Sequence, residues 1–259
     1  MLSIIFKSTL QRIAMNDEKK SFNILNESHL HHTLKVFFKT QNPGSKLEVP
    51  YKQWICDIET EDQGIIEIQT GNILPLKAKI KEAIKDKRHI TIVHPVITEK
   101  KIEVYTRDGT LVSKRKSPKK ENIFDALKTL TGIYDLLLTR YVTIIFIEVK
   151  TTEQRIQTDE KIQLPNKSRH FMKNWYKAGK ELSEIGTQHT FHGKKSYLAL
   201  LPKLSNNFSS LELKEAFNEQ DFPKSAQKHA NLILWLYSRM GLIQYTEKRG
   251  RRNYYRLSE

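Results

Sequence analysis

The stretch Trp54-Ile-Cys-Asp-Ile-Glu-Thr-Glu-Asp-Gln-Gly-Ile-Ile-Glu-Ile-Gln-Thr70 decides how the front of this chain folds. Its first half is a mainly apolar run, and its second half alternates apolar and polar residues, as half-buried strands do. The polar turn 61–64 separates the two runs. The stretch therefore predicts a hairpin of two strands, 51–58 and 65–70.

Polar side chains gather on this predicted hairpin. Glu67 and Gln69 lie two residues apart and share one face of the second strand, and Asp57 stands beside them on the first strand. Two carboxylates brought together repel each other unless a hard cation such as Mg²⁺ lies between them. Solvated carboxylates on a surface hairpin are the simpler alternative.

Helices and strands alternate around the hairpin. A helix over 22–39 precedes it, with Asn26 as N-cap, and a helix over 74–85 follows it. The apolar run Ile90-Thr-Ile-Val93 predicts a short buried strand that ends at His94-Pro95. Downstream we expect a hairpin (101–105 and 110–113), a helix (122–130) and a strand (142–149). This alternation predicts an α/β or α+β fold.

The C-terminal part has a different pattern. Two helices, 211–217 and 226–240, are followed by two strands, 242–246 and 253–257, with a basic turn between them. Helix, helix and basic hairpin predict a winged helix-turn-helix over 205–259. The polar and weakly patterned segment 151–204 is expected to be a middle or linker region, and 1–20 an N-terminal extension.

Composition limits the classes of function. The 259 residues carry a formal net charge of +15, which favours a polyanionic partner, although a merely basic soluble protein is the alternative. The single cysteine, Cys56, excludes an intrachain disulfide and fits the cytoplasm. No apolar run approaches the roughly 20 residues that a membrane helix needs, so we expect no membrane partner.

The spacing Asp57-x9-Glu67-Ile68-Gln69 resembles the signature of the PD-(D/E)XK nuclease superfamily, with glutamine where lysine is usual. The chain also looks like a family of uncharacterised bacterial proteins with a nuclease-like front and a winged-helix end. The matching segments are Asn26-Glu-Ser-x-Leu-His31, Trp54-Ile-Cys-Asp57, Ile66-Glu-Ile-Gln-Thr70, Val93-His-Pro-Val96, Arg115-Lys-Ser-Pro-Lys-Lys120 and Lys248-Arg-Gly-Arg-Arg-Asn253.

This resemblance implies a restriction-endonuclease-like αβββαβ core over 21–150 and a DNA endonuclease that uses Mg²⁺ or Mn²⁺, in defence or repair. Asp57 and Glu67 would hold the metal, and Gln69 would occupy the usual lysine position. Lys79 on the following helix would assist, and Glu27 on the first helix would be a further acidic group near the site.

Alternatives remain open. Gln69 cannot exchange protons, which favours a non-catalytic DNA-binding protein with a degenerate nuclease fold. A rival motif, Asp135-x12-Glu148-Val149-Lys150, contains a literal Glu-x-Lys but lacks a hairpin before it. A protein partner or a homodimer that uses the winged helix is a third reading.

Two basic regions and one helix start are expected to contact DNA phosphates, because guanidinium and ammonium groups bind them. These residues are Arg115, Lys116, Lys119 and Lys120 in the first region, Lys224 and Lys228 on the second C-terminal helix, and Lys248, Arg249, Arg251 and Arg252 at the hairpin tip.

Overall fold

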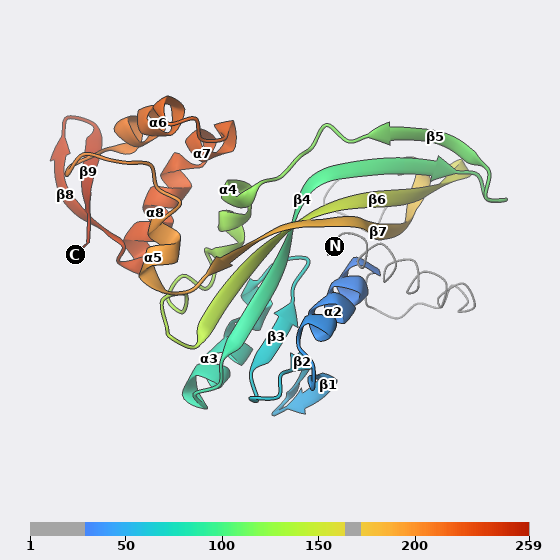
Figure 1. Cartoon of the computed structure of the whole chain (residues 1–259). Helices are drawn as coiled ribbons and strands as arrows, with labels where there is room; N and C mark the ends of the chain where they lie inside the picture. The colour runs from blue at the N-terminus through green and yellow to red at the C-terminus, as the bar shows by residue number, and fades with distance from the viewer. Residues whose placement is uncertain (1–28, 164–171, 259) are drawn as a thin grey trace, which may run out of the picture.

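A computed structural model describes residues 29–163 and 172–258. Within these residues the chain forms a mixed α/β protein, as the sequence predicts. It has a seven-stranded sheet, helices packed on it, and a C-terminal group of helices with its own two-stranded hairpin (Figure 1). The predicted positions of Glu27 and of the extension 1–20 lie outside the described residues.

The front of the sheet is a three-stranded antiparallel meander. Helix α2 precedes it, and the elements in order are α2 (His29–Gln41), β1 (Lys46–Tyr51), β2 (Trp54–Glu59) and β3 (Ile65–Ile68). The predicted hairpin is confirmed, because β2 and β3 pair antiparallel with Ile58 opposite Ile66. Its second strand is shorter than expected and ends at Ile68, so Gln69 lies just beyond it.

A helix connects the meander to the centre of the sheet. The 3-10 turn η1 (Leu74–Leu76) and helix α3 (Lys77–Lys85) lead into β4 (Ile90–Tyr105), which runs parallel to β3. The sequence predicts that this strand ends at His94-Pro95, but it continues. Pairing with β3 stops at Val93, so Pro95 lies on a strand edge with no β3 residue opposite it, where proline is tolerated.

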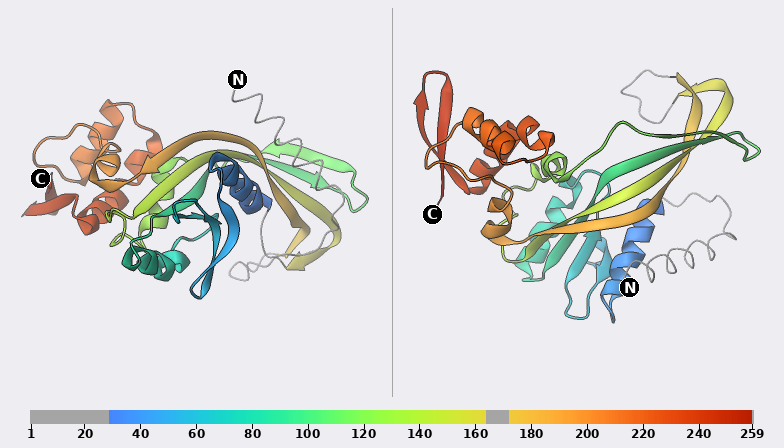
Figure 2. Two further views of the ribbon diagram at one scale, coloured as in Figure 1. Left: turned by 60° about the horizontal axis from the view of Figure 1, so that its bottom comes forward. Right: turned by 45° about the horizontal axis from the view of Figure 1, so that its top comes forward.

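The strands β4, β6 and β7 form a long arm that extends well past the meander (Figure 2). The predicted hairpin of β4 with β5 (Leu111–Lys116) is confirmed. Where the sequence predicts a middle or linker region, the structure has the second half of β6 (Val142–Gln163) and all of β7 (Met172–Phe191) in the sheet. Hydropathy does not reveal these strands, because their buried side chains include Thr151, Glu153 and Thr158.

Both faces of the central strands are covered. On one face α2 packs over a cluster that includes Leu34, Ile66 and Val93. On the other face lies a larger cluster, which includes Ile80 of α3 and Phe124. The helical segments α4 (Ile123–Ala126) and η2 (Leu127–Leu130) contribute to this second face.

The C-terminal unit is continuous with this second cluster. Its elements are α5 (Gly193–Leu198), α6 (Ser210–Glu219), α7 (Lys224–Lys228), α8 (Ala230–Met240), β8 (Ile243–Arg249) and β9 (Arg252–Leu257). The predicted helix 226–240 is divided at His229, whose ring Nε2 lies 3.0 Å from Oδ1 of Asp125 in α4. Phe124 packs against Phe217 of α6 with ring centroids 5.7 Å apart. The C-terminal unit therefore packs against α4.

None of the helices within the described ranges is long and apolar enough to cross a membrane.

Candidate functional site

Glu67 and Lys79 form a buried ion pair beneath the meander. Lys79 Nζ lies 2.8 Å from Glu67 Oε1 and also donates to the carbonyl oxygen of Ile55 at 2.8 Å. Only 4% of Glu67 and 5% of Lys79 is exposed. Burial raises the pKa of Glu67 above its usual value, although the Lys79 ammonium opposes that shift.

Asp57 turns toward helix α2. Its Oδ2 accepts a hydrogen bond from the Ile68 N–H at 2.7 Å and lies 3.3 Å from His31 Nε2. Burial opposes ionisation of Asp57, but the His31 ring and the Ile68 N–H together hold its pKa below the usual value. The sequence pattern alone does not show the His31 contact, because it depends on how α2 lies across the sheet.

The strand β2 is irregular at Asp57, which explains this orientation. Cys56 belongs to the cluster under α3, whereas Ile58 belongs to the cluster under α2. Residues two apart on a regular strand share a face, so the alternation breaks between them. On the neighbouring strand, Glu48 has a φ of +54° and pairs with Lys35 at 2.9 Å.

The two carboxylates are close enough for the Asp57 charge to raise the pKa of Glu67. The Gln69 side chain makes no hydrogen bond to either carboxylate. Its Nε2 donates to the backbone carbonyl oxygen of Asn72 at 2.5 Å, and the backbone carbonyl oxygen of Gln69 lies 2.7 Å from His94 Nδ1. The structure thus brings Asp57, Glu67 and Lys79 together and leaves Gln69 at the margin. Among the described residues, no three histidine, cysteine, aspartate or glutamate side chains form a metal-binding group.

The residues of the rival motif are engaged in three separate pairs. Asp135 pairs with Lys77 at 2.8 Å. Glu148 lies 3.1 Å from His189, and Lys150 pairs with Glu184 at 2.9 Å, both across β6 and β7. These pairs give each of the three side chains a different partner.

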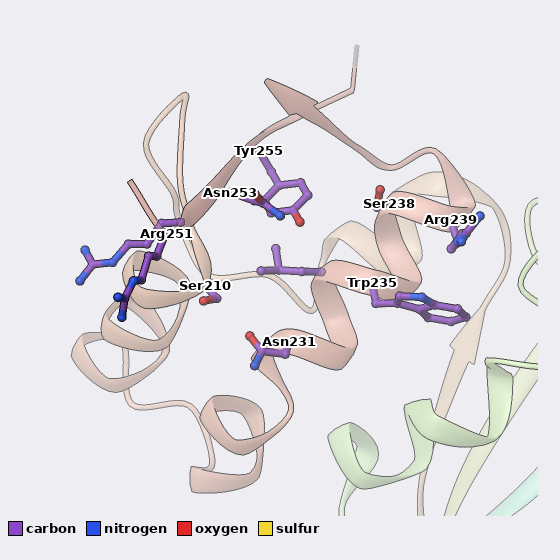
Figure 3. Close-up of a pocket in the computed structure, with 10 residues that line it drawn as sticks. Ser210, Asn231, Trp235, Ser238, Arg239, Arg251, Asn253 and Tyr255 are labelled. Carbon is purple, nitrogen blue, oxygen red and sulfur yellow. The ribbon is translucent and has the colours of Figure 1, made fainter. Parts of the chain in front are cut away.

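An open groove of about 400 Å³ lies between α8 and β9 (Figure 3). Asn231, Trp235 and Ser238 of α8 line one side, and Asn253 and Tyr255 of β9 line the other. The remaining lining residues are Ser210, Leu234, Arg239, Arg251 and Arg252. The groove therefore combines guanidinium groups, amides and aromatic rings.

The residues predicted to contact DNA lie on three surfaces. Arg251 and Arg252 line the groove, and Lys248 and Arg249 share its exposed hairpin, where Arg249 stacks on Tyr254 at 4.7 Å. Lys224 and Lys228 are exposed on α7. Arg115 and Lys116 on β5, with Lys119 and Lys120 after it, lie along the long arm; Lys116 pairs with Glu99, and Lys119 pairs with Glu121, each at 3.0 Å.

Several groove residues are absent from the sequence prediction, namely Asn231, Trp235, Ser238 and Arg239. An exposed Trp235 in an otherwise apolar helix is the one available signal, and its side chain is 42% exposed. Only the placement of β9 against α8 reveals the groove.

In structural terms, this is a mixed α/β protein. It has a buried Glu67–Lys79 ion pair under the meander and a basic groove at its C-terminal end. The chain belongs to the family described as domain of unknown function DUF8091, whose model matches residues 28–192. This match covers the sheet and ends before α5.

An uncharacterised protein of Treponema pallidum (strain Nichols) is 27% identical over 237 residues, which cover 91% of this chain and 87% of the relative. This alignment is longer than the family match. No solved structure matches the chain.

Proposed function

We propose that this protein binds duplex DNA through its C-terminal unit. The observation that carries the proposal is the groove between α8 and β9, with Arg239, Arg251 and Arg252 among its lining residues. Arginine side chains match phosphate oxygens with two parallel hydrogen bonds. The net charge of +15 adds attraction for a polyanion over the whole molecule.

The order of elements supports a winged-helix mode of binding. The helices α6, α7 and α8 precede the β8–β9 hairpin, and Phe208 pairs with Tyr255 in front of α6. In that mode a helix enters the major groove and the hairpin lies along the backbone or the minor groove. Asn231 and Asn253 would face base edges, since amides pair well with adenine.

The test is fluorescence anisotropy of a labelled duplex over a series of salt concentrations. The variant Arg251→Gln/Arg252→Gln removes two groove charges, and Arg107→Gln, at the exposed β4–β5 turn, is the matched control. Loss of two phosphate contacts should reduce the slope of log affinity against log salt by about 2. An unchanged slope in the double variant would refute the groove as the binding surface.

Phosphodiester hydrolysis at Asp57, Glu67 and Lys79 is a second candidate. It is favoured by the contacts at the meander and by the order helix, three strands, helix, parallel strand, which agrees with a nuclease-like core. The residues present fit part of a Mg²⁺ site, since this ion commonly uses one or two carboxylates and takes its other ligands from water and substrate.

In this candidate Asp57 and Glu67 would hold Mg²⁺ or Mn²⁺, and the bound cation would polarise the phosphate and activate water. Lys79 would have to exchange its contact with Glu67 for one with the substrate, and Gln69 would orient a water molecule by hydrogen bonding. Metal-dependent cleavage that Asp57→Ala and Glu67→Ala both abolish would establish the activity. If the protein binds DNA but does not cleave it with either Mg²⁺ or Mn²⁺, the hydrolysis candidate is refuted and the DNA-binding proposal stands alone.

A further inference from the structure

A small cavity on the long arm gathers four lysines. It has a volume of about 200 Å³ and lies between β4, β6, β7 and the loop that joins β5 to α4. Its lining residues are Ile97, Lys100, Lys119, Glu121, Glu153, Lys177 and Lys180.

The two acidic residues of the cavity are already paired. Glu153 accepts from Lys100 at 3.2 Å and from Arg155 at 2.6 Å, and Glu121 pairs with Lys119 at 3.0 Å. The side chains of Lys177 and Lys180 make neither a hydrogen bond nor an ion pair with any described residue. Four lysines against two glutamates leave the cavity with an excess of positive charge.

Lys180 is placed by the sheet and not by an ion pair. It lies directly opposite Glu153 in the β6–β7 register, but the carboxylate of Glu153 is bonded to Lys100 and Arg155. Burial, together with the neighbouring charges of Lys177 and Lys100, lowers the pKa of Lys180 to about 8, although the Glu121 and Glu153 carboxylates oppose this shift. The Lys180 ammonium is therefore destabilised, and an anion in the cavity would relieve it.

We propose that this cavity binds a phosphate group, with Lys177 and Lys180 as its direct ligands. Sites that enclose drug-sized ligands measure roughly 300–1,000 Å³, so a cavity of about 200 Å³ suits one phosphate better than a whole nucleotide. Phosphate oxygens are strong acceptors for ammonium groups. The phosphate comes either from a nucleic-acid backbone, which rests on the proposed function, or from free phosphate, which does not.

The test is a titration of the full chain with inorganic phosphate. Calorimetry measures the phosphate affinity, and NMR of the lysine side chains measures their pKa values. The variant is Lys180→Met, and the matched control is Lys161→Met at an exposed position of β6 outside the cavity. We expect phosphate to raise the pKa of Lys180, and Lys180→Met to weaken phosphate binding by about tenfold or more, as loss of a charged hydrogen bond does.

The exposed variant Lys177→Gln keeps the test valid if Lys180→Met does not fold, and it should also weaken phosphate binding. An unchanged Lys180 pKa in saturating phosphate, or equal affinities of Lys180→Met and Lys161→Met, would overturn the inference.

Duplex DNA separates the two sources of phosphate. Competition between duplex and inorganic phosphate, with both weakened by Lys180→Met, would assign the site to the DNA backbone. Independent binding of the two would assign it to free phosphate. Phosphate binding by a chain that fails to bind duplex would refute the proposed function and leave this inference intact.

Discussion

Replacing Lys79 by methionine tests the role of the buried pair under the meander. The substitution keeps a long apolar side chain but removes the ammonium group that lies 2.8 Å from Glu67 Oε1. Glu67 is only 4% exposed, so water cannot take over as its partner. Removal of one partner of a buried ion pair costs about 3–5 kcal/mol. We expect a loss of that size in the free energy of unfolding at pH 7.

The loss should depend on pH in a defined direction. The pKa of Glu67 is already raised in the folded protein, and it rises further when Lys79 is absent. A carboxyl group with a raised folded pKa destabilises the fold as pH rises from its unfolded pKa, near 4.3, through its folded pKa. The deficit of Lys79→Met should therefore be largest at neutral pH and should shrink toward pH 4.

The assay is urea denaturation at several pH values, with Lys81→Met as the control at an exposed position of the same helix. The double variant Lys79→Met/Glu67→Leu should regain most of the stability, because apolar pairs replace buried ion pairs at little cost. A loss below about 1 kcal/mol, or one of equal size at pH 4 and pH 7, would refute the reasoning.

Three further predictions use the same denaturation assay. Asp57→Asn should lower the free energy of unfolding by about 1–3 kcal/mol at neutral pH. Because the folded pKa of Asp57 is depressed, the stability difference between Asp57→Asn and the parent should vanish as pH falls through that pKa, and a difference that stays constant with pH would contradict this. Ser209→Ala removes the capping box of α6 and should cost about 0.5–2 kcal/mol, whereas no loss would mean that Glu212 alone satisfies the helix start. Gly241→Ala forces a side chain into a φ of +74° after α8 and should cost about 1–2 kcal/mol, and an unchanged midpoint would show that the turn relaxes.

Local patterns in the sequence determined most of the elements. The alternation of apolar and polar residues over 65–70 predicted a strand, and the turn before it predicted the hairpin with β2. The structure caps α6 with Ser209 and ends α8 at Gly241, and such caps and left-handed turns depend on a few adjacent residues. The sequence also placed Asp57, Glu67 and Lys79 on neighbouring elements.

Tertiary structure decided which of those residues meet. Gln69 lies past the end of β3 and turns to Asn72, because the strand stops one residue before it. Asp57 faces His31 since β2 is irregular at that point and α2 crosses above it. Neither outcome is encoded in strand alternation, which assumes a regular backbone.

Non-local pairing decided the rest. The strands of the long arm could not be predicted from hydropathy, because they contain buried polar residues such as Thr151 and Glu153. The burial of these residues results from strand pairing and from packing against distant elements. Lys100 and Lys180 are 80 positions apart and line one cavity only because β4 and β7 flank β6. Local conformation and the positive charge were therefore predictable from the sequence alone, whereas the topology of the sheet determined where that charge is concentrated.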